Sequence, residues 1–225
     1  MRSEDKTKKA EDKFGAARWL ASIFGVLGGL GGILHGVGEI LQGNVAPEGI
    51  FIESWTRGPI AAHMGGDPAV TIIPNILVTG ILALILSTAA IVWSVAFVHR
   101  KRGGLVLLLL SMGMLLAGGG VGPPTLGILA GIGGLGINSP YTWWRTHLRA
   151  GLRRFLARLW PCIFGVCVAN GVFLVIGHVI LVFFLGFHNA EIFTNSFLFA
   201  VLLLLLSIVT GVAYDIQRRD AEMTG

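Results

Sequence analysis

Charged side chains are scarce in this chain of 225 residues: only 13% are Asp, Glu, Lys or Arg, whereas 54% are hydrophobic. Soluble domains carry about 25% charged residues. Together with a mean hydropathy of +0.77, this scarcity excludes an ordinary water-soluble domain. Cysteine is also rare, because Cys162 and Cys167 are the only two, and within one helix they would lie on different faces. No disulfide framework is therefore expected.

Motifs of several enzyme classes are missing as well. The sequence has no Gly-rich phosphate loop before a helix, no HExxH zinc motif, no EF-hand loop and no GxSxG nucleophile elbow. Every lysine lies in the N-terminal tail or at Lys101, so no intramembrane lysine is present for a retinal Schiff base. These absences make an enzyme the less favoured interpretation.

Long apolar stretches dominate the rest of the chain and predict an all-α, polytopic transmembrane bundle. We expect a single transmembrane domain over residues 19–214, between a flexible tail of residues 1–18 and a second tail of residues 215–225. The predicted spans are 19–42, 71–98, 105–118, 124–137, 161–184 and 196–213.

The third and fourth of these six spans come from one uncharged stretch, 105–137. As a single helix it would be too long for a hydrocarbon core of ~30 Å. Its centre, Gly118–Pro124, contains the Gly and Pro residues of a turn. We therefore divide it into two short spans, which are also short enough to form a re-entrant pair.

The basic residues predict the orientation. In the six-span topology, Arg57 is the one Lys or Arg that faces outward, and all the others lie at the inner side or in the tails. Basic residues beside spans are retained in the cytoplasm. This pattern predicts a cell membrane protein (plasma or inner membrane) with both termini cytoplasmic. Because these residues adjoin spans, their expected partners are anionic lipid headgroups rather than nucleic acid.

Residues 140–159 predict an amphipathic helix that lies at the membrane surface. Leu and aromatic residues recur on one side, and Arg145, Arg149 and Arg153 form the adjoining basic stripe. We expect these three arginines to contact lipid headgroups. A solvated connector and a docking surface for a partner protein are the alternatives.

Glycines recur along the first span at Gly25, Gly29, Gly32 and Gly36. Such small-residue stripes let helix backbones approach closely within a membrane. They favour packing inside the bundle, a homo-oligomer or association with a membrane partner.

Four polar residues within spans are the main candidate site: His35, Glu39, Asn170 and His178. Ionisable groups are costly in a bilayer and are usually directed at a protein interior or a watery cavity. Counting 1.5 Å per helical residue from Trp19 and Trp160 places both histidines at a similar depth in the outer half. We expect these residues to line an outward-facing polar pocket.

The outer loops add His63, Asp67, His188 and Glu191 as further candidate ligands. Histidine with carboxylate suits a divalent metal, and paired intramembrane histidines beside glycine would suit haem. Neither cofactor has a specific motif here, so the sequence assigns no cofactor. The leading hypothesis is an integral membrane protein that binds or transports a small ligand or ion. A haem- or metal-dependent membrane oxidoreductase and a non-catalytic assembly or anchor subunit are the alternatives.

Overall fold

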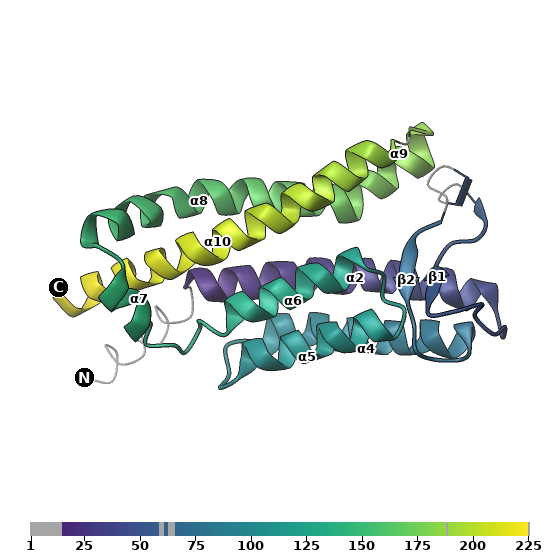
Figure 1. Cartoon of the computed structure of the whole chain (residues 1–225), viewed down its shortest axis with the longest axis horizontal. Coiled ribbons are helices and arrows are strands. Elements are labelled where there is room, and N and C mark those ends of the chain that lie inside the picture. Colours follow the sequence, from purple (N-terminus) through teal and green to yellow (C-terminus); the bar gives the residue numbers. More distant parts are fainter. Residues whose placement is uncertain (1–14, 59–60, 63–65, 188, 225) are drawn as a thin grey trace.

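The computed structural model describes residues 15–58, 61–62, 66–187 and 189–224 (Figure 1). In chain order, the elements are α2 (Ala16–Gln42), β1 (Phe51–Glu53), β2 (Pro68–Val70), α4 (Ile76–Ala96), α5 (Gly103–Leu116), α6 (Gly122–Gly134), α7 (Thr142–His147), α8 (Ala150–Val172), the π-helical turn η2 (Phe173–Gly177), α9 (His178–Leu185) and α10 (Ala190–Thr224). The two short strands pair antiparallel in the loop between α2 and α4. The predicted all-α class is confirmed.

Within the described residues, four helical stretches are long and apolar enough to cross a membrane: Ala16–Gln42, Ile76–Ala96, Ala150–Leu185 and Ala190–Met223. They are compatible with an integral membrane protein. Helices α5 and α6 have 14 and 13 residues, about 20 Å each, and are too short to cross a ~30 Å core alone. Neither six spans nor a re-entrant pair is confirmed. Instead, α5 and α6 pack against each other and against α2, and α5 also contacts α4.

The surface helix predicted over 140–159 is divided in two. Helix α7 is short, and its C-cap Leu148 has an extended backbone with φ −86° and ψ 118°. Helix α8 then begins at Ala150 and continues through Pro161 into the predicted fifth span, so that one helical stretch reaches Leu185. Residues 150–159 are therefore the first turns of a long apolar helix, and the prediction of a separate surface helix is wrong for them.

Two other boundaries differ from the predicted ones. Helix α4 begins at Ile76 rather than Thr71, because the Asn75 side chain accepts a hydrogen bond from the Val78 amide at 3.0 Å and caps the helix. Helix α10 runs to Thr224, so the expected tail from residue 215 onward continues the last helix up to that point.

Helix α2 lies in the middle of the bundle and contacts α4, α5, α6, α8 and α10. Its glycines allow these neighbours to approach closely. A Cβ atom at Gly36 would lie 2.9 Å from the carbonyl oxygen of Gly80 in α4, and one at Gly28 would lie 2.7 Å from that of Pro123 in α6. The predicted stripe therefore packs mainly against α4, and Gly28, which lies outside the stripe, packs against α6.

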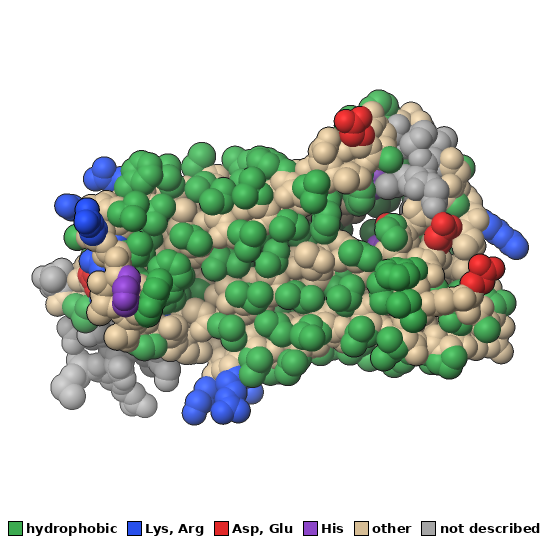
Figure 2. Space-filling model, viewed as in Figure 1, with side chains coloured by type: hydrophobic (Ala, Val, Ile, Leu, Met, Phe, Trp, Pro, Cys, Tyr) green, Lys and Arg blue, Asp and Glu red, His purple; other side chains and the backbone are tan. Residues whose placement is uncertain are grey.

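The two ends of the bundle carry opposite charge (Figure 2). The basic end contains the α4–α5 turn with Arg100, Lys101 and Arg102, together with the arginines of residues 145–158. The Asn138 side chain donates a 3.3 Å hydrogen bond to the Arg100 carbonyl oxygen and connects the α4–α5 turn to the chain after α6. The acidic end contains Glu48, Glu53, Asp67 and Glu191, with Arg57 as a basic exception. This separation is consistent with helices that bring the predicted cytoplasmic residues to one side.

Candidate functional site

A buried polar cluster lies where α2 meets the β1–β2 pair. His35 and Glu39 are one turn apart on α2, so their side chains share a face. Ser54 directly follows β1 and Asp67 directly precedes β2. The antiparallel pairing brings these two loop residues together, because the Ser54 amide donates a 2.9 Å hydrogen bond to the Asp67 carbonyl oxygen. Four polar residues from three segments are thus assembled at one place.

Three contacts join these four residues into one chain. His35 Nδ1 lies 2.8 Å from Ser54 Oγ, and Ser54 Oγ donates to Glu39 Oε1 at 3.1 Å. At the other side of the ring, His35 Nε2 lies 3.2 Å from Asp67 Oδ2. Glu39 and Ser54 are fully buried, and His35 is only 4% exposed. The chain therefore runs from a carboxyl group inside the bundle to the Asp67 carboxyl group, which is 25% exposed.

The His35 Nε2–Asp67 Oδ2 contact is a close approach of two heavy atoms, and if it is also a hydrogen bond, the chain holds an additional proton. Three links need three hydrogens, whereas the Ser54 hydroxyl and a neutral imidazole supply only two. If Ser54 donates to Glu39, then His35 Nδ1 must donate to Ser54, and Nε2 needs a second hydrogen to bond the Asp67 carboxylate. The complete chain thus requires a third hydrogen on His35, Glu39 or Asp67.

The α5–α6 turn closes over this cluster. Gly118 and Gly120 both have positive φ, at +81° and +84°. A Cβ atom at Gly118 would lie 2.5 Å from Glu39 Oε2, and one at Gly120 would lie 2.5 Å from His35 Cε1. Glu39 Oε2 itself has no hydrogen-bond partner among the described residues. Two glycines are therefore needed both for the backbone of the turn and for the space that the polar side chains fill.

A cavity of about 500 Å³ opens beside the cluster. In Figure 2 it is the dark hollow near the acidic end. Its walls come from α2, α6, the α8–α9 stretch, α10 and the loop around β2. Among the described residues, three ionisable ones line the cavity, His35, Asp67 and His178. The rest of the described lining is mostly apolar, with Leu34, Leu126, Leu174, Val175, Val179, Val182 and Phe197 among its members.

The π-helical turn η2 shapes one wall of this cavity. It spans Phe173–Gly177 and contributes Leu174 and Val175 to the lining, and His178 follows directly. A π turn contains one more residue than an α turn and shifts the faces of the residues after it, and such turns are frequent at functional sites. The sequence analysis predicted an uninterrupted span here and did not anticipate this turn.

The predicted pocket residues are only partly brought together. His35 and His178 line the same cavity, and the His178 ring lies 4.4 Å from that of Phe193 in α10. Glu39 is connected to the cavity through Ser54 and His35. Asn170 is elsewhere, because its side-chain amide donates a 2.8 Å hydrogen bond to the Ser196 carbonyl oxygen and holds α8 against α10.

The loop residues that were predicted as ligands are also only partly brought to the cavity. Asp67 belongs to the cluster and lines the cavity. Glu191 is exposed in the first turn of α10 and is not among the residues that line the cavity. His63 and His188 lie outside the described residues. Ser54 was not predicted as a site residue, and Gly118 and Gly120 were predicted only as part of a turn, since nothing in their local pattern indicates a polar contact.

This arrangement gives little support to a metal site or to hydrolysis by a serine triad. Both ring nitrogens of His35 are engaged by Ser54 and Asp67, and within the described chain no group of three or more His, Cys, Asp or Glu residues is suited to a metal ion. The order Ser54–His35–Asp67 has the connectivity of a hydrolytic triad. Ser54, however, is fully buried, does not line the cavity and donates its hydrogen to Glu39.

No protein-family model, curated protein or solved structure matches the chain. The chemistry of the site is therefore the only indication of its function.

Proposed function

We propose that this chain is an integral membrane protein that binds small cationic amphiphiles, such as long-chain amines, in the cavity beside His35 and Asp67. The observation that supports this most directly is the lining of the cavity, which is apolar except for one end that carries a carboxyl group and two imidazoles. Pockets of this kind use apolar walls for affinity and a few polar groups for orientation. An alkyl chain would lie between α6, α9 and α10, with its polar head at Asp67.

A positively charged head is favoured over a negative one for two reasons. Asp67 is the acidic group at the cavity, and the other acids at this end, Glu48, Glu53 and Glu191, add negative potential that attracts cations. An ammonium group can also donate the hydrogen bond that Asp67 otherwise accepts from His35 Nε2. The ammonium would then replace the His35 Nε2–H as the donor to Asp67, and the proton carried by Nε2 would be released.

The proposed mechanism is therefore an exchange of one proton for one organic cation. Before binding, His35 bonds both Ser54 and Asp67 and holds the cluster together. On binding, the ammonium bonds Asp67 Oδ2, and His35 keeps its bond to Ser54 as a neutral ring. Such competition for one carboxylate is the simplest way to couple a proton to a transported amine.

Photolabelling of the purified protein tests the proposal. We would use three C12 probes that carry the same diazirine and differ only in the head group, namely an amine, an alcohol and a carboxylic acid. The amine should label residues of the cavity most strongly. Asp67→Asn should lower amine labelling at least about tenfold, as expected when a charged hydrogen-bonding partner is removed, and should change alcohol labelling little.

Two further variants make the result decisive. Glu191→Gln removes an exposed acid from the same end without touching the cavity and should leave labelling unchanged. Val179→Trp fills the cavity and should reduce labelling by all three probes. Stronger labelling by the carboxylic acid than by the amine, or equal amine labelling of Asp67→Asn and the native protein, would refute the proposal. Calorimetric titration of the unlabelled amine in buffers of different ionisation enthalpy should show release of about one proton.

A further inference from the structure

At the basic end, Asp215, Asp220 and Glu222 each contact another part of the described chain. Asp215 accepts hydrogen bonds from the backbone amides of Ala16 and Ala17, at 2.6 and 3.1 Å, and so caps the start of α2. Asp220 pairs with Arg145, and at 3.2 Å with Arg153.

Glu222 in turn lies 3.6 Å from Arg218, one turn earlier on α10. Two of the three arginines that were predicted to contact lipid thus have a partner within the chain. Their side chains are also partly covered, at 30% exposure for Arg145 and 17% for Arg153.

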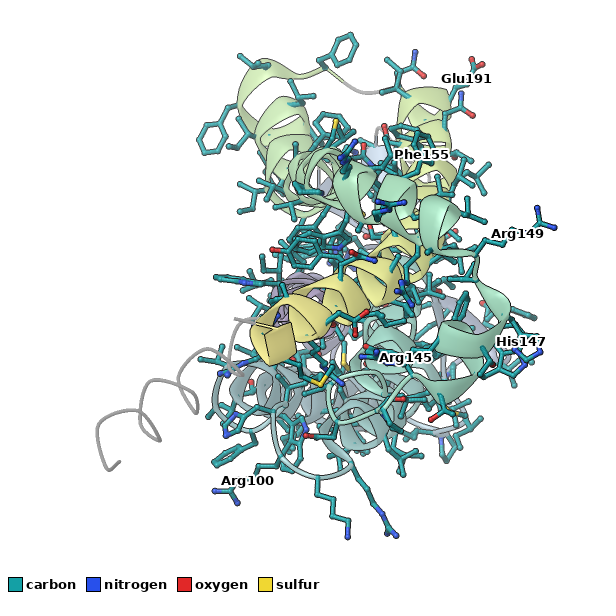
Figure 3. All side chains as sticks on the ribbon, turned by 90° about the vertical axis from the view of Figure 1, so that its left-hand side faces the viewer. Arg100, Arg145, His147, Arg149, Phe155 and Glu191 are labelled. Atoms are coloured by element: carbon teal, nitrogen blue, oxygen red, sulfur yellow. The ribbon has the colours of Figure 1, made fainter. Side chains whose placement is uncertain are left out.

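A different set of arginines is left facing outward. Arg149, Arg154 and Arg158 are exposed, and no acidic partner for any of them is found in the part of the chain that the structure describes. Figure 3 views the molecule from the basic end, where Arg149 projects away from the helices and Arg145 lies among them. Arg154 and Arg158 are one turn apart on α8 and therefore point to the same side.

An apolar strip adjoins these arginines on the same helix. Leu152, Phe155 and Leu159 are 48%, 57% and 36% exposed. Their spacing of three and four residues places them on one face, next to the face of Arg154 and Arg158. Exposed arginine beside exposed Leu and Phe has the character of an amphipathic surface that meets a bilayer interface.

The position of this surface also fits a membrane interface. Residues 150–159 open a helical stretch of 36 residues, about 54 Å long at 1.5 Å per residue. A hydrocarbon core of ~30 Å cannot contain the whole stretch, so its charged first turns extend to the headgroup level or beyond. Trp143, 61% exposed on the adjacent α7, is an aromatic residue of the kind enriched at this level.

We infer that the first turns of α8 form a binding site for anionic phospholipid. In this site the exposed Arg154 and Arg158, with Arg149 at the start of the helix, supply the positive charge that attracts the phosphate group. The apolar strip of Leu152, Phe155 and Leu159 contacts the adjoining glycerol backbone and upper acyl chain. The strip is the reason that an intact lipid fits better than a soluble anion, because a free phosphate would leave these side chains exposed.

Native mass spectrometry of the delipidated protein in detergent tests this inference. Phosphatidylglycerol would be titrated into the native protein and into the triple variant Arg149→Gln, Arg154→Gln, Arg158→Gln. Each arginine near an anionic surface contributes about fivefold to binding, so the triple variant should lose about a hundredfold in affinity if the three contributions are independent. All three side chains are exposed, and the variant should therefore fold normally. Phosphatidylcholine binding should be equal for both proteins.

The matched control removes the same charge from the other side of the basic end. The variant Arg100→Gln, Lys101→Gln, Arg102→Gln should retain phosphatidylglycerol binding within about twofold, because these residues belong to the α4–α5 turn and not to the first turns of α8. Equal losses in both triple variants would overturn the inference, since they would indicate attraction by net charge alone. Displacement of the lipid by inorganic phosphate at equal concentration would also overturn it and would identify the ligand as a soluble anion.

Discussion

Replacing Gly120 by alanine is expected to disrupt the buried cluster, because the α5–α6 turn packs directly on His35. Gly120 has a φ of +84°, and a Cβ atom there would lie 2.5 Å from Cε1 and 2.6 Å from Cδ2 of His35. The left-handed backbone costs an alanine about 1–2 kcal/mol. The overlap adds about 1–3 kcal/mol, because His35 is held by Ser54 and Asp67 and cannot move without breaking a contact. We therefore expect the free energy of unfolding to fall by about 2–5 kcal/mol.

The measurement is the free energy of unfolding from SDS titration, followed by circular dichroism. Gly186→Ala is the control for the backbone cost, because Gly186 is also left-handed (φ +58°, ψ +16°) and has nothing within 4 Å of the new Cβ atom. It should cost only about 1–2 kcal/mol. In a His35→Ala background the three atoms nearest to the new Cβ atom are removed, and the cost of Gly120→Ala should fall toward that of this control.

Equal losses for Gly120→Ala and Gly186→Ala would contradict the packing of the α5–α6 turn on His35. Failure of His35→Ala to reduce the cost of Gly120→Ala would contradict it as well. Either result would also remove the reason for a glycine at this position, apart from its backbone conformation.

Three further predictions follow from the buried polar contacts. Asp215→Ala should lower the free energy of unfolding by about 1–2 kcal/mol, the range for the loss of a helix cap, and Asp215→Asn, which keeps an acceptor oxygen, should recover part of the loss in the same titration. Ser54→Ala should cost about 1–3 kcal/mol, because it leaves His35 and Glu39 without their shared partner inside the bundle; a cost near zero would mean that the three links do not form together. Burial, reinforced by the neighbouring Asp215, raises the pKa of Tyr141, so the unfolded chain releases this phenolic proton near pH 10 while the folded protein still retains it. Stability should accordingly fall as the pH rises above about 10, and Tyr141→Phe should flatten that decline in thermal melts at pH 9 to 11.

The long helices could be predicted from the sequence because their cause is local. An uncharged stretch of about 20 residues is long enough for one span, and the charges at its ends indicate how it is placed. The divergences arose where one segment depends on another. Residues 150–159 have the pattern of a surface helix, yet they continue into the next span, because one proline at position 161 does not terminate the helix. Likewise, the residues from 215 onward read as a charged tail but remain helical, with Asp215 and Asp220 bonded to other elements.

The candidate site shows the same division between local and long-range causes. The sequence identified His35 and Glu39, since polar residues in an apolar helix are conspicuous and their spacing places them on one face. It could not indicate Ser54, an ordinary serine in a loop, because the antiparallel pairing of β1 and β2 is what carries it to the end of α2. Asn170 had the same polar character as His35. The sequence could not show that its side chain bonds Ser196 instead of lining the cavity.

The sequence by itself thus determined the helical class, the apolar character of the long helices and the separation of acidic from basic ends, because each follows from which residues are adjacent in the chain. Only the tertiary structure decided which polar groups meet. The α2 glycines, the β1–β2 pair, the α5–α6 turn and the π turn before His178 set distances of a few ångströms between residues far apart in sequence, and hydrogen bonds depend on those distances.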